Sequence, residues 1–394
     1  MSTMITSPGS SLITPLAQEM PQSGIRKFFD YISGREDIIS LGIGEPDFKT
    51  PRVIREACIA ALEQGRTEYT PNAGLLELRQ RIAGYLHDTH KVSYDPNDEI
   101  MVTIGSSEAL DLALRVLIQT GDEILVPSPC YVSYSPITGL CSGTTVEVQT
   151  SASNDFKLTA EELEKCITPR SKLLILSYPS NPTGAVMSYE DWLPIARLVE
   201  KYNLFVLSDE IYAELTYGSQ HVSFAAMPGM KERTLLISGF SKAFAMTGWR
   251  IGYVCGPSEV VKPMLKVHQY TIMCAPILGQ IAAIEALKPA GLEAKDMMMD
   301  SYNQRRQMFV QGLRQAGLPC HEPHGAFYAF PSIAHTGLTS EQFAERLLQE
   351  MNVLVVPGTA FGASGEGFVR CSYATSTEKL EQALEKIGQF VRQL

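Results

Sequence analysis

The stretch EIMVTIGSSEALDLALRVLIQTGDEILVPS, residues 99–128, decides the fold of this chain. It opens with a short β-rich run, continues with apolar residues at helical spacing and closes with a second β-rich run. The helical stripe consists of Ala109, Leu112, Ala113, Val116 and Leu117. Asp111 and Arg115 fall on the opposite, exposed face of that helix. The order strand, helix, strand is typical of a βαβ unit in a parallel sheet.

The same rhythm continues further along the chain. Four more β-rich runs follow, namely KLLILSYP at 172, NLFVLSDE at 203, TLLISGFS at 234 and GYVCGP at 252. Helical patterns alternate with these runs, which favours a largely parallel sheet between helices. We therefore predict an α/β fold whose large domain covers residues 51–289.

From about residue 290 the pattern changes. A polar helical segment is followed by GAFYAFP at 325, a helical pattern from 340, and the β-rich runs NVLVVPG at 352 and GFVRCSYA at 367. This mixture indicates a smaller α+β domain over residues 290–394. The segment before GEPDF at 44 has too few alternations to form a domain, so we assign residues 1–50 to the small domain as well.

Composition limits the classes of partner. A chain of 394 residues with 45% hydrophobic content is long enough for two packed lobes. Its net charge of −10 opposes binding to nucleic acid. No apolar run approaches the roughly 20 residues that span a bilayer. The eight cysteines form no CxxC pair, and the first residues lack the order of a signal peptide. We expect a cytoplasmic protein that binds neither nucleic acid nor membrane.

Polar residues follow the predicted strands, where parallel sheets bind ligands. After the strand at 99, Gly105, Ser106 and Ser107 open a helix and offer free N–H groups and two hydroxyls. This arrangement suits a phosphate, although a serine pair is also an ordinary helix cap. After the strand at 172, the turn SNPTG leaves the amide of Asn181 at the strand end. HEPH at 321 offers no third ligand with metal-site spacing, so we predict no metal.

The next two strands end in charged residues. Asp209, with Tyr212 three positions later, follows one strand, and Lys242, with Arg250 eight positions later, follows the other. A buried acid is costly unless it meets a cation, although Asp209 is also a possible helix cap and both cations are possible surface residues. Together the strand ends offer an amine, an acid, a phenol, an amide and a phosphate cradle. Pyridoxal 5′-phosphate (PLP) requires this combination.

Three motifs occur in a familiar order: YPSNPTG at 178, SDEIY at 208 and GFSKAFAMTGWRIG at 239. With them, the chain resembles the class I and II aminotransferases of fold type I, from LGIGEPDFKTP at 41 to FVRCSYA at 368. The resemblance implies a PLP-transferase fold. It also implies a ping-pong exchange of an amino group between an L-amino acid and a 2-oxo acid, through pyridoxal and pyridoxamine forms of the cofactor.

The resemblance assigns the cofactor ring to four residues. Lys242 would form the Schiff base with the cofactor and, once released, would move the proton between the substrate Cα and the cofactor. Asp209 would keep the ring nitrogen protonated. Tyr212 and Asn181 would bond the phenolate oxygen of the ring.

The cofactor phosphate would be held by Arg250, Ser106 and Ser107. Tyr69, in TEYTPNAGLLELRQ at 67, matches a tyrosine that reaches the phosphate from the neighbouring subunit. The resemblance therefore implies a homodimer with shared active sites.

Two further positions complete the implied site. Tyr131, in PSPCYVSY at 127, would stack on the cofactor ring or belong to the core. Arg370 would bind the substrate α-carboxylate with help from Asn181 and the N–H of Gly44, unless it is a surface residue of its strand.

One position departs from the family pattern. Members of the family often place a serine phosphate ligand three residues before the lysine, where this chain has Gly239. Ser238 or Ser241 could replace it, or the bond could be absent.

The substrate is less constrained. Several segments, including SGIRKFFDYISGREDIISLGIGEPDFKTP at 23, resemble the PatA-type enzymes associated with N-acetyl-L,L-diaminopimelate in lysine synthesis. That likeness implies exchange between L-glutamate and N-acetyl-2-amino-6-oxopimelate. No arginine occurs between Arg250 and Arg305, which disfavours strict aspartate-type recognition. As a hypothesis, Ile25 and Arg26 form a lid over the substrate side chain.

Other functions remain open. Aspartate, aromatic or broad-specificity aminotransferases and PLP-dependent C–S lyases use the same cofactor apparatus. PLP domains also serve as ligand sensors in transcription regulators, but the chain shows no basic helix-turn-helix extension. No GxGxxG follows a predicted strand, so a nicotinamide-binding protein is not favoured.

Overall fold

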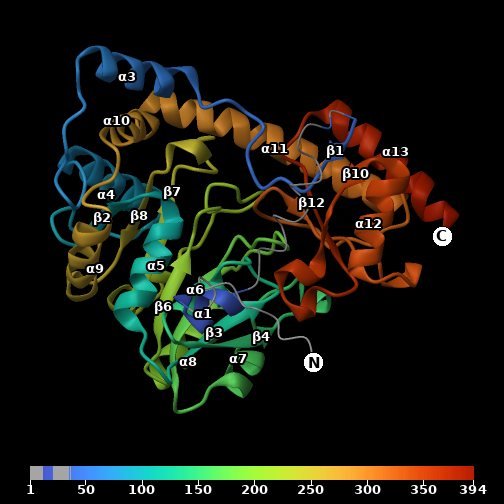
Figure 1. Ribbon diagram of the computed structural model, residues 1–394, viewed down its shortest axis with the longest axis horizontal. Helices are drawn as coiled ribbons and strands as arrows, with labels where there is room; N and C mark the ends of the chain where they lie inside the picture. Colours follow the sequence, from blue (N-terminus) through green and yellow to red (C-terminus); the bar gives the residue numbers. More distant parts are fainter. Residues whose placement is uncertain (1–11, 21–34, 36) are drawn as a thin grey trace.

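A sheet of seven strands forms the centre of the larger part of the molecule (Figure 1). The structure is a computed structural model that describes residues 12–20, 35 and 37–394, and the strand count refers to these. The strands of this sheet are β2 (Ile100–Thr103), β3 (Glu123–Ser128), β4 (Thr144–Gln149), β5 (Ser171–Ser177), β6 (Phe205–Asp209), β7 (Thr234–Gly239) and β8 (Gly252–Cys255). Their order is β2-β8-β7-β6-β5-β3-β4.

The mostly parallel sheet expected from the sequence is confirmed. Strands β4, β3, β5, β6 and β7 are parallel, and β8 is antiparallel to both of its neighbours. The segment 240–251 that joins β7 to β8 contains turns and no crossover helix, so β8 returns in the opposite direction. The prediction missed β4, an edge strand of threonine, valine and glutamate with little burial.

Helices cover both faces of the sheet because successive side chains of each strand point to opposite sides. In β5, Leu173 and Ile175 pack in the same cluster as α5 and α9, whereas Leu174 and Leu176 pack with α7 and α8. The helices of this part are α3 (Arg52–Glu63), α4 (Leu76–His90), α5 (Gly105–Leu117), α6 (Tyr134–Leu140), α7 (Ala160–Cys166), α8 (Tyr189–Lys201), α9 (Ser258–Thr271) and α10 (Ile277–Ala286).

Within the described residues, the smaller part of the molecule holds short strands and three helices (Figure 1). Its strands are β1 (Ile39–Ser40), β9 (Tyr328–Ala329), β10 (Val353–Leu354), β11 (Val356–Pro357) and β12 (Val369–Ser372). Its helices are α11 (Pro289–Gln315), α12 (Ser340–Met351) and α13 (Thr377–Gln393). Strand β12 lies between β11 and β9, and β1 pairs with β10 in parallel. Short 3₁₀ turns are η2 (Ala152–Asn154), η3 (Phe224–Ala226), η4 (Lys231–Arg233), η5 (Thr247–Trp249), η6 (Ala334–Thr336), η7 (Gly358–Phe361) and η8 (Ala363–Gly365).

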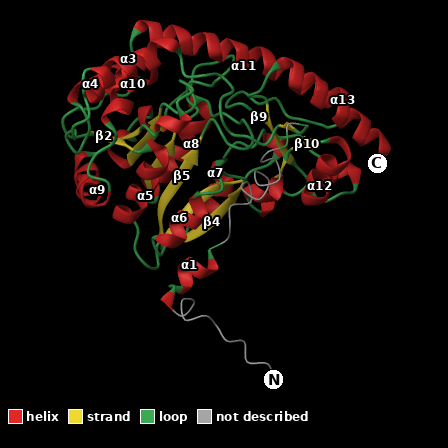
Figure 2. Ribbon diagram, turned by 45° about the horizontal axis from the view of Figure 1, so that its top comes forward, coloured by secondary structure: helices red, strands yellow, loops and turns green. Residues whose placement is uncertain are grey.

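Helix α11 links the two parts and runs along one side of the molecule (Figure 2). Near its start Leu292 packs with the large-part cluster of α3, α4 and α10. Towards its end Phe309 and Leu313 belong to the small-part core. Strand β1 packs in that core too, whereas α1 (Pro15–Glu19) lies beside α6 of the large part. The domain boundaries at 50 and 289 stay a prediction.

Three features of the described residues limit the classes of protein further. None of their helices combines the length and the apolar character needed to cross a bilayer. All eight cysteines are free thiols. Within the same ranges, no group of three or more His, Cys, Asp or Glu side chains is arranged to hold a metal ion.

Candidate active site

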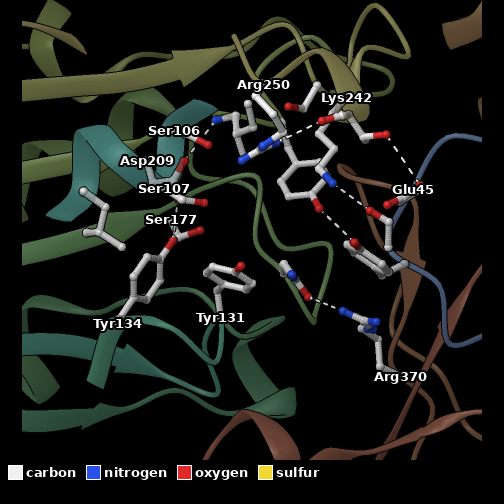
Figure 3. Close-up of a pocket in the computed structure, with 18 of the residues that line it drawn as sticks. Glu45, Ser106, Ser107, Tyr131, Tyr134, Ser177, Asp209, Lys242, Arg250 and Arg370 are labelled. Atoms are coloured by element: carbon white, nitrogen blue, oxygen red, sulfur yellow. Dashed lines mark hydrogen bonds between the residues drawn. The ribbon is translucent and has the colours of Figure 1, made fainter. Parts of the chain in front are cut away.

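A cavity of about 590 Å³ lies where β5, β6 and β7 end, between the large sheet and the small part (Figure 3). Every predicted site residue except Tyr69 lines it: Gly44, Ser106, Ser107, Tyr131, Asn181, Asp209, Tyr212, Lys242, Arg250 and Arg370. Tyr69 is 80% exposed and lies outside the cavity, and its role at a subunit contact stays a prediction. Figure 3 shows Ser106 and Ser107 on the opposite side of the cavity from Arg370.

Lys242 follows β7 and points into the cavity (Figure 3). Its Nζ donates a hydrogen bond of 2.6 Å to the carbonyl oxygen of Gly44 and lies 5.9 Å from the centre of the Tyr212 ring. Burial lowers the pKa of Lys242 to about 8, although the nearby carboxylate of Glu45 acts in the opposite direction. The amine is therefore neutral in a useful fraction of molecules near neutral pH, and only a neutral amine is a nucleophile.

The lowered pKa predicts the pH dependence of amine reactivity. Below its pKa the neutral fraction of Lys242 grows about tenfold per pH unit, and above it the fraction levels off. We expect the rate of PLP binding to cofactor-free protein to follow this course, with half of the maximum near pH 8. Stopped-flow absorbance between pH 6 and pH 11 measures it. A rate that keeps rising to pH 10 would contradict the perturbed pKa.

Asp209 ends β6 in a closed environment (Figure 3). The hydroxyl of Tyr134 donates to its Oδ2 at 2.8 Å, and the N–H of Ile211 donates to its Oδ1 at 3.3 Å. No cationic side chain within the described ranges pairs with this carboxylate at salt-bridge distance, and burial raises the pKa of Asp209 to about 6. A buried acid in this condition is suited to a cationic ligand atom, such as a protonated ring nitrogen.

Arg370 is held rigidly at the small-part side of the cavity. It is only 1% exposed, so the surface alternative for this residue is wrong. Its Nη1 donates to Asn181 Oδ1 at 2.9 Å and its Nη2 donates to the carbonyl of Gly42 at 2.7 Å. The guanidinium lies 4.3 Å from the ring centre of Tyr328. Its Nε is buried and has no hydrogen-bond partner among the described residues.

A second cationic region lies at the start of α5. Ser106 and Ser107 occupy its first turn, where backbone N–H groups have no helical partner. The guanidinium of Arg250 lies against Gly105, where an added Cβ would come within 2.6 Å of its Nη2. Gly105 has a φ of +71°, a conformation that glycine adopts freely. The positive end of the helix and the arginine therefore form one site for an anion.

The structure separates the two serines near Gly239. Ser241 lines the cavity, whereas the hydroxyl of Ser238 donates to the backbone carbonyl of Glu210 at 3.3 Å. Ser241 is thus the serine available to a ligand. A side chain at position 239 would meet the neighbouring strand, since an added Cβ would lie 2.9 Å from the Cα of Gly252.

Sequence reasoning missed several residues of the cavity. They are Glu45, Leu110, Tyr134, Ser177, Ile211, Thr247, Gly248 and Tyr328. Tyr134 and Tyr328 matter most, because one bonds Asp209 and the other shares a 2.8 Å hydrogen bond with the hydroxyl of Tyr212. Both tyrosines stand in runs quoted above, but nothing in the local pattern tells which side chain faces the site. Ile25 and Arg26, the suggested lid, lie outside the described residues.

Comparison with known proteins identifies the family. The family model described as aminotransferase class I and II matches residues 36–387. The chain therefore belongs to this family of PLP-dependent aminotransferases. The residues of the cavity fit PLP, because they include a partly neutral amine, a buried acid without a cationic partner and an anion site at a helix start.

Individual relatives differ in their named substrates. The chain is 51% identical to a putative aminotransferase YugH of Bacillus subtilis, over 97% of this chain and 99% of the relative. It is 45% identical to an aspartate aminotransferase of Pyrococcus abyssi, over 94% and 96%. It is 44% identical to a probable N-acetyl-LL-diaminopimelate aminotransferase of Bacillus subtilis, over 96% of both chains. The crystal structure of an aromatic aminotransferase from Pyrococcus horikoshii superposes with a TM-score of 0.89 at 44% identity, covering 93% and 99%.

Proposed function

We propose that this aminotransferase takes its amino group from L-glutamate and passes it to a 2-oxo acid in two half-reactions. One observation carries the proposal. The amine of Lys242, the carboxylate of Asp209 and the guanidinium of Arg370 line a single cavity, and the carboxylate has no cationic partner at salt-bridge distance among the described residues. An amine, an acid and a carboxylate clamp are the groups that amino-acid chemistry on PLP requires.

We assign the cofactor contacts as follows. Asp209 would hold the ring nitrogen, and the hydroxyl of Tyr212 and the amide of Asn181 would bind the phenolate oxygen. Burial raises the pKa of Tyr212 well above its usual value, so this hydroxyl is a proton donor. The phosphate is held at the start of α5 by Arg250 and the serines already described, and Tyr131 packs against the ring.

The substrate is held by Arg370 and acted on by Lys242. When bound, PLP supplies an aldehyde carbon that reacts with amines and a ring that accepts electrons from the Cα–H bond of the amino acid. Arg370 binds the α-carboxylate in a bidentate manner, which fixes the Cα relative to the lysine. Lys242 Nζ then takes the proton from Cα as a general base, and in the second half-reaction it returns a proton to the Cα of the new amino acid.

The charge of the cavity bears on substrate range. Its cationic side chains, within the described residues, are Lys242, Arg250 and Arg370, and each has a role toward the cofactor or the α-carboxylate. A side-chain carboxylate of the substrate thus meets no dedicated arginine in this part of the chain. This supports an acceptor range wider than that of a strict aspartate enzyme.

A more specific candidate is the acceptor N-acetyl-2-amino-6-oxopimelate. The relative named probable N-acetyl-LL-diaminopimelate aminotransferase, 44% identical, favours it. This acceptor would place the enzyme in lysine synthesis.

The proposed donor is tested with purified, PLP-loaded protein. We expect L-glutamate alone to remove the visible absorption band of the lysine-bound cofactor and to release one 2-oxoglutarate per site. Adding a 2-oxo acid should restore the band, and a panel of aspartate-derived, aromatic and N-acetylated oxo acids ranks the acceptors by kcat/KM. A band unchanged by glutamate would refute the donor. Pyruvate release from cystathionine would indicate C–S lyase activity instead.

We further infer a homodimer in which Tyr69 enters the partner's site. Tyr69 and Tyr270 are 80% and 88% exposed, and Ile272 and Met273 extend this apolar surface. Asn72 follows Tyr69 in the chain, and Met273 follows the end of α9. The side chain of Asn72 donates a 2.7 Å hydrogen bond to the carbonyl of Met273, which joins these two segments. Exposed apolar clusters of this kind are typical of subunit contacts.

Subunit mixing tests the shared site. Tyr69→Ala and Lys242→Ala protomers are each expected to be inactive at PLP concentrations that just saturate the wild type. Mixed by unfolding and refolding together, they should recover about a quarter of wild-type activity, because half of the dimers are hybrids with one intact site of two. Each variant treated alone serves as the control. Absence of recovery in verified hybrids would contradict the exchange of Tyr69.

A further inference from the structure

A buried hydrogen-bonded pair of side chains lies behind the anion site at the start of α5. His268, in the last turn of α9, is fully buried, and its Nδ1 lies 2.6 Å from Oε1 of Glu108 in the first turn of α5. The second oxygen of Glu108 accepts a 2.5 Å hydrogen bond from the N–H of Ile104, the residue before the helix. Neither Glu108 nor His268 lines the cavity. The pair therefore supports the first turn of α5 from the side opposite to the ligand.

Glu108 carries a charge that competes with the ligand of the helix. The positive end of α5 attracts any anion, and a carboxylate in the first turn is attracted to the same N–H groups as a phosphate. The two bonds of Glu108 direct its charge to His268 and to Ile104, away from the serine side of the turn. Ser106 and Ser107 are thereby left free to face the cavity.

A histidine is energetically unfavourable at this buried position. Its Nε2 is buried and has no partner among the described residues, so Glu108 supplies its side-chain hydrogen bond. The elements that carry the pair, α5 and α9, pack together through an apolar cluster that includes Leu112 and Met264. An apolar residue would fill such a place without leaving a polar atom unpaired. The contact with Glu108 is what distinguishes histidine from such a residue.

The same histidine adjoins the exposed surface that we assign to the partner subunit. Its backbone carbonyl accepts hydrogen bonds from the N–H groups of Ile272 at 2.8 Å and Met273 at 2.9 Å. The carbonyl of Met273 in turn binds the side chain of Asn72. His268 thus connects the anion site to the end of α9, which carries Tyr270, and through Met273 and Asn72 to the segment that carries Tyr69.

We propose that the Glu108–His268 pair is a positioning device that keeps the first turn of α5 in its phosphate-binding conformation. The proposal rests on the placement of the cofactor phosphate in the previous section. Because the pair acts only on the phosphate end, its loss should weaken binding of PLP and leave binding of pyridoxal, which lacks the phosphate, unchanged.

The test compares dissociation constants of cofactor-free protein for PLP and for pyridoxal, measured by absorbance titration. In His268→Leu we expect PLP to bind about tenfold more weakly, as for loss of one hydrogen bond to a charged group, with pyridoxal unchanged. His268→Asn places an amide near the position of Nδ1 and should restore most of the PLP affinity. His90→Leu is the matched control, since His90 forms another buried pair, with Glu214 at 3.2 Å.

The outcomes distinguish failure of the phosphate site from failure of the positioning role of His268. Arg250→Ala should lower PLP affinity relative to pyridoxal by about ten- to a hundredfold, and failure to do so would refute the phosphate site itself. If Arg250→Ala behaves as expected but His268→Leu weakens both ligands equally, or no more than His90→Leu does, the positioning role is refuted.

A second comparison tests the positioning role even if His268→Leu folds poorly. His268→Gln carries its amide at the position of Nε2, away from Glu108, whereas His268→Asn carries it at the position of Nδ1. The proposal expects the PLP to pyridoxal affinity ratio of His268→Gln to fall well below that of His268→Asn. Equal ratios in the two amide variants would overturn it.

Discussion

Replacement of Lys242 by alanine lowers kcat by about 10⁴-fold or more, because it removes both the amine that bonds the cofactor and the base that moves the Cα proton. No other lysine lines the cavity within the described residues, so no neighbour can take over the proton transfer. Single-turnover kinetics with L-glutamate measure the loss of the chemical step directly. PLP should still bind, since its phosphate and ring contacts remain.

Two controls make the Lys242 result specific. Lys172→Ala removes a lysine at the far end of β5 that pairs with Asp122 at 2.9 Å, and it should leave kcat unchanged. Small primary amines added to Lys242→Ala should restore part of the rate, because the cavity vacated by the side chain admits them. A Lys242→Ala protein that retained more than about one per cent of kcat would contradict the assignment of the base.

Replacement of Asp209 by asparagine lowers kcat by about 10³-fold and leaves the fold intact. Asparagine keeps the size of the side chain and a partner for Tyr134, but it removes the charge that holds the ring nitrogen protonated. Asp209→Glu keeps the charge and should retain more activity than Asp209→Asn. Rates measured with L-glutamate, together with the cofactor absorption spectrum, follow both variants. Equal activity of Asp209→Asn and wild type would refute the role of the charge.

Asp209→Asn lowers kcat, but we expect it to raise the stability of the cofactor-free fold. The folded pKa of Asp209, about 6, lies above the unfolded value of 3.8, so the folded protein binds this proton more tightly. At pH 7.5 the buried carboxylate is ionised and destabilises the cofactor-free fold, and this cost fades as the pH falls from 6 towards 3.8. Cofactor-free Asp209→Asn should therefore have a higher Tm than wild type at pH 7.5, and the difference should shrink at pH 5.

The rhythm of the sequence was sufficient to predict most of the fold. The runs at 99, 123, 172, 203, 234 and 252 correspond to strands of the central sheet, because buried parallel strands are short, apolar and bounded by turns. Their polar ends identified the cavity, since the carboxyl ends of parallel strands meet at one edge. The direction of β8 did not follow from its own residues, because it depends on the connection before it.

The missed site residues share a physical cause. Tyr134 and Tyr328 reach the cavity from a short helix of the large part and a two-residue strand of the small part. Their positions depend on how these elements pack, and an amphipathic pattern reports only that a side chain is inside. Glu45 lines the cavity but is exposed. An exposed charged residue is ordinary in any sequence, so its type does not indicate a site.

The antiparallel return of β8 has a consequence for the size of ligand that the enzyme accepts. Because the chain turns back directly after β7, Lys242 and Arg250 stand on the same loop, residues 240–251, and in the proposed placement of PLP this one loop would hold both ends of the cofactor. In that arrangement the distance between the group that binds the aldehyde and the group that binds the phosphate is set by this loop alone. It would not change if the two parts of the molecule moved relative to each other. The loop would therefore fix the length of the cofactor that can bind, and a cofactor analogue with one more methylene before its phosphate would not fit.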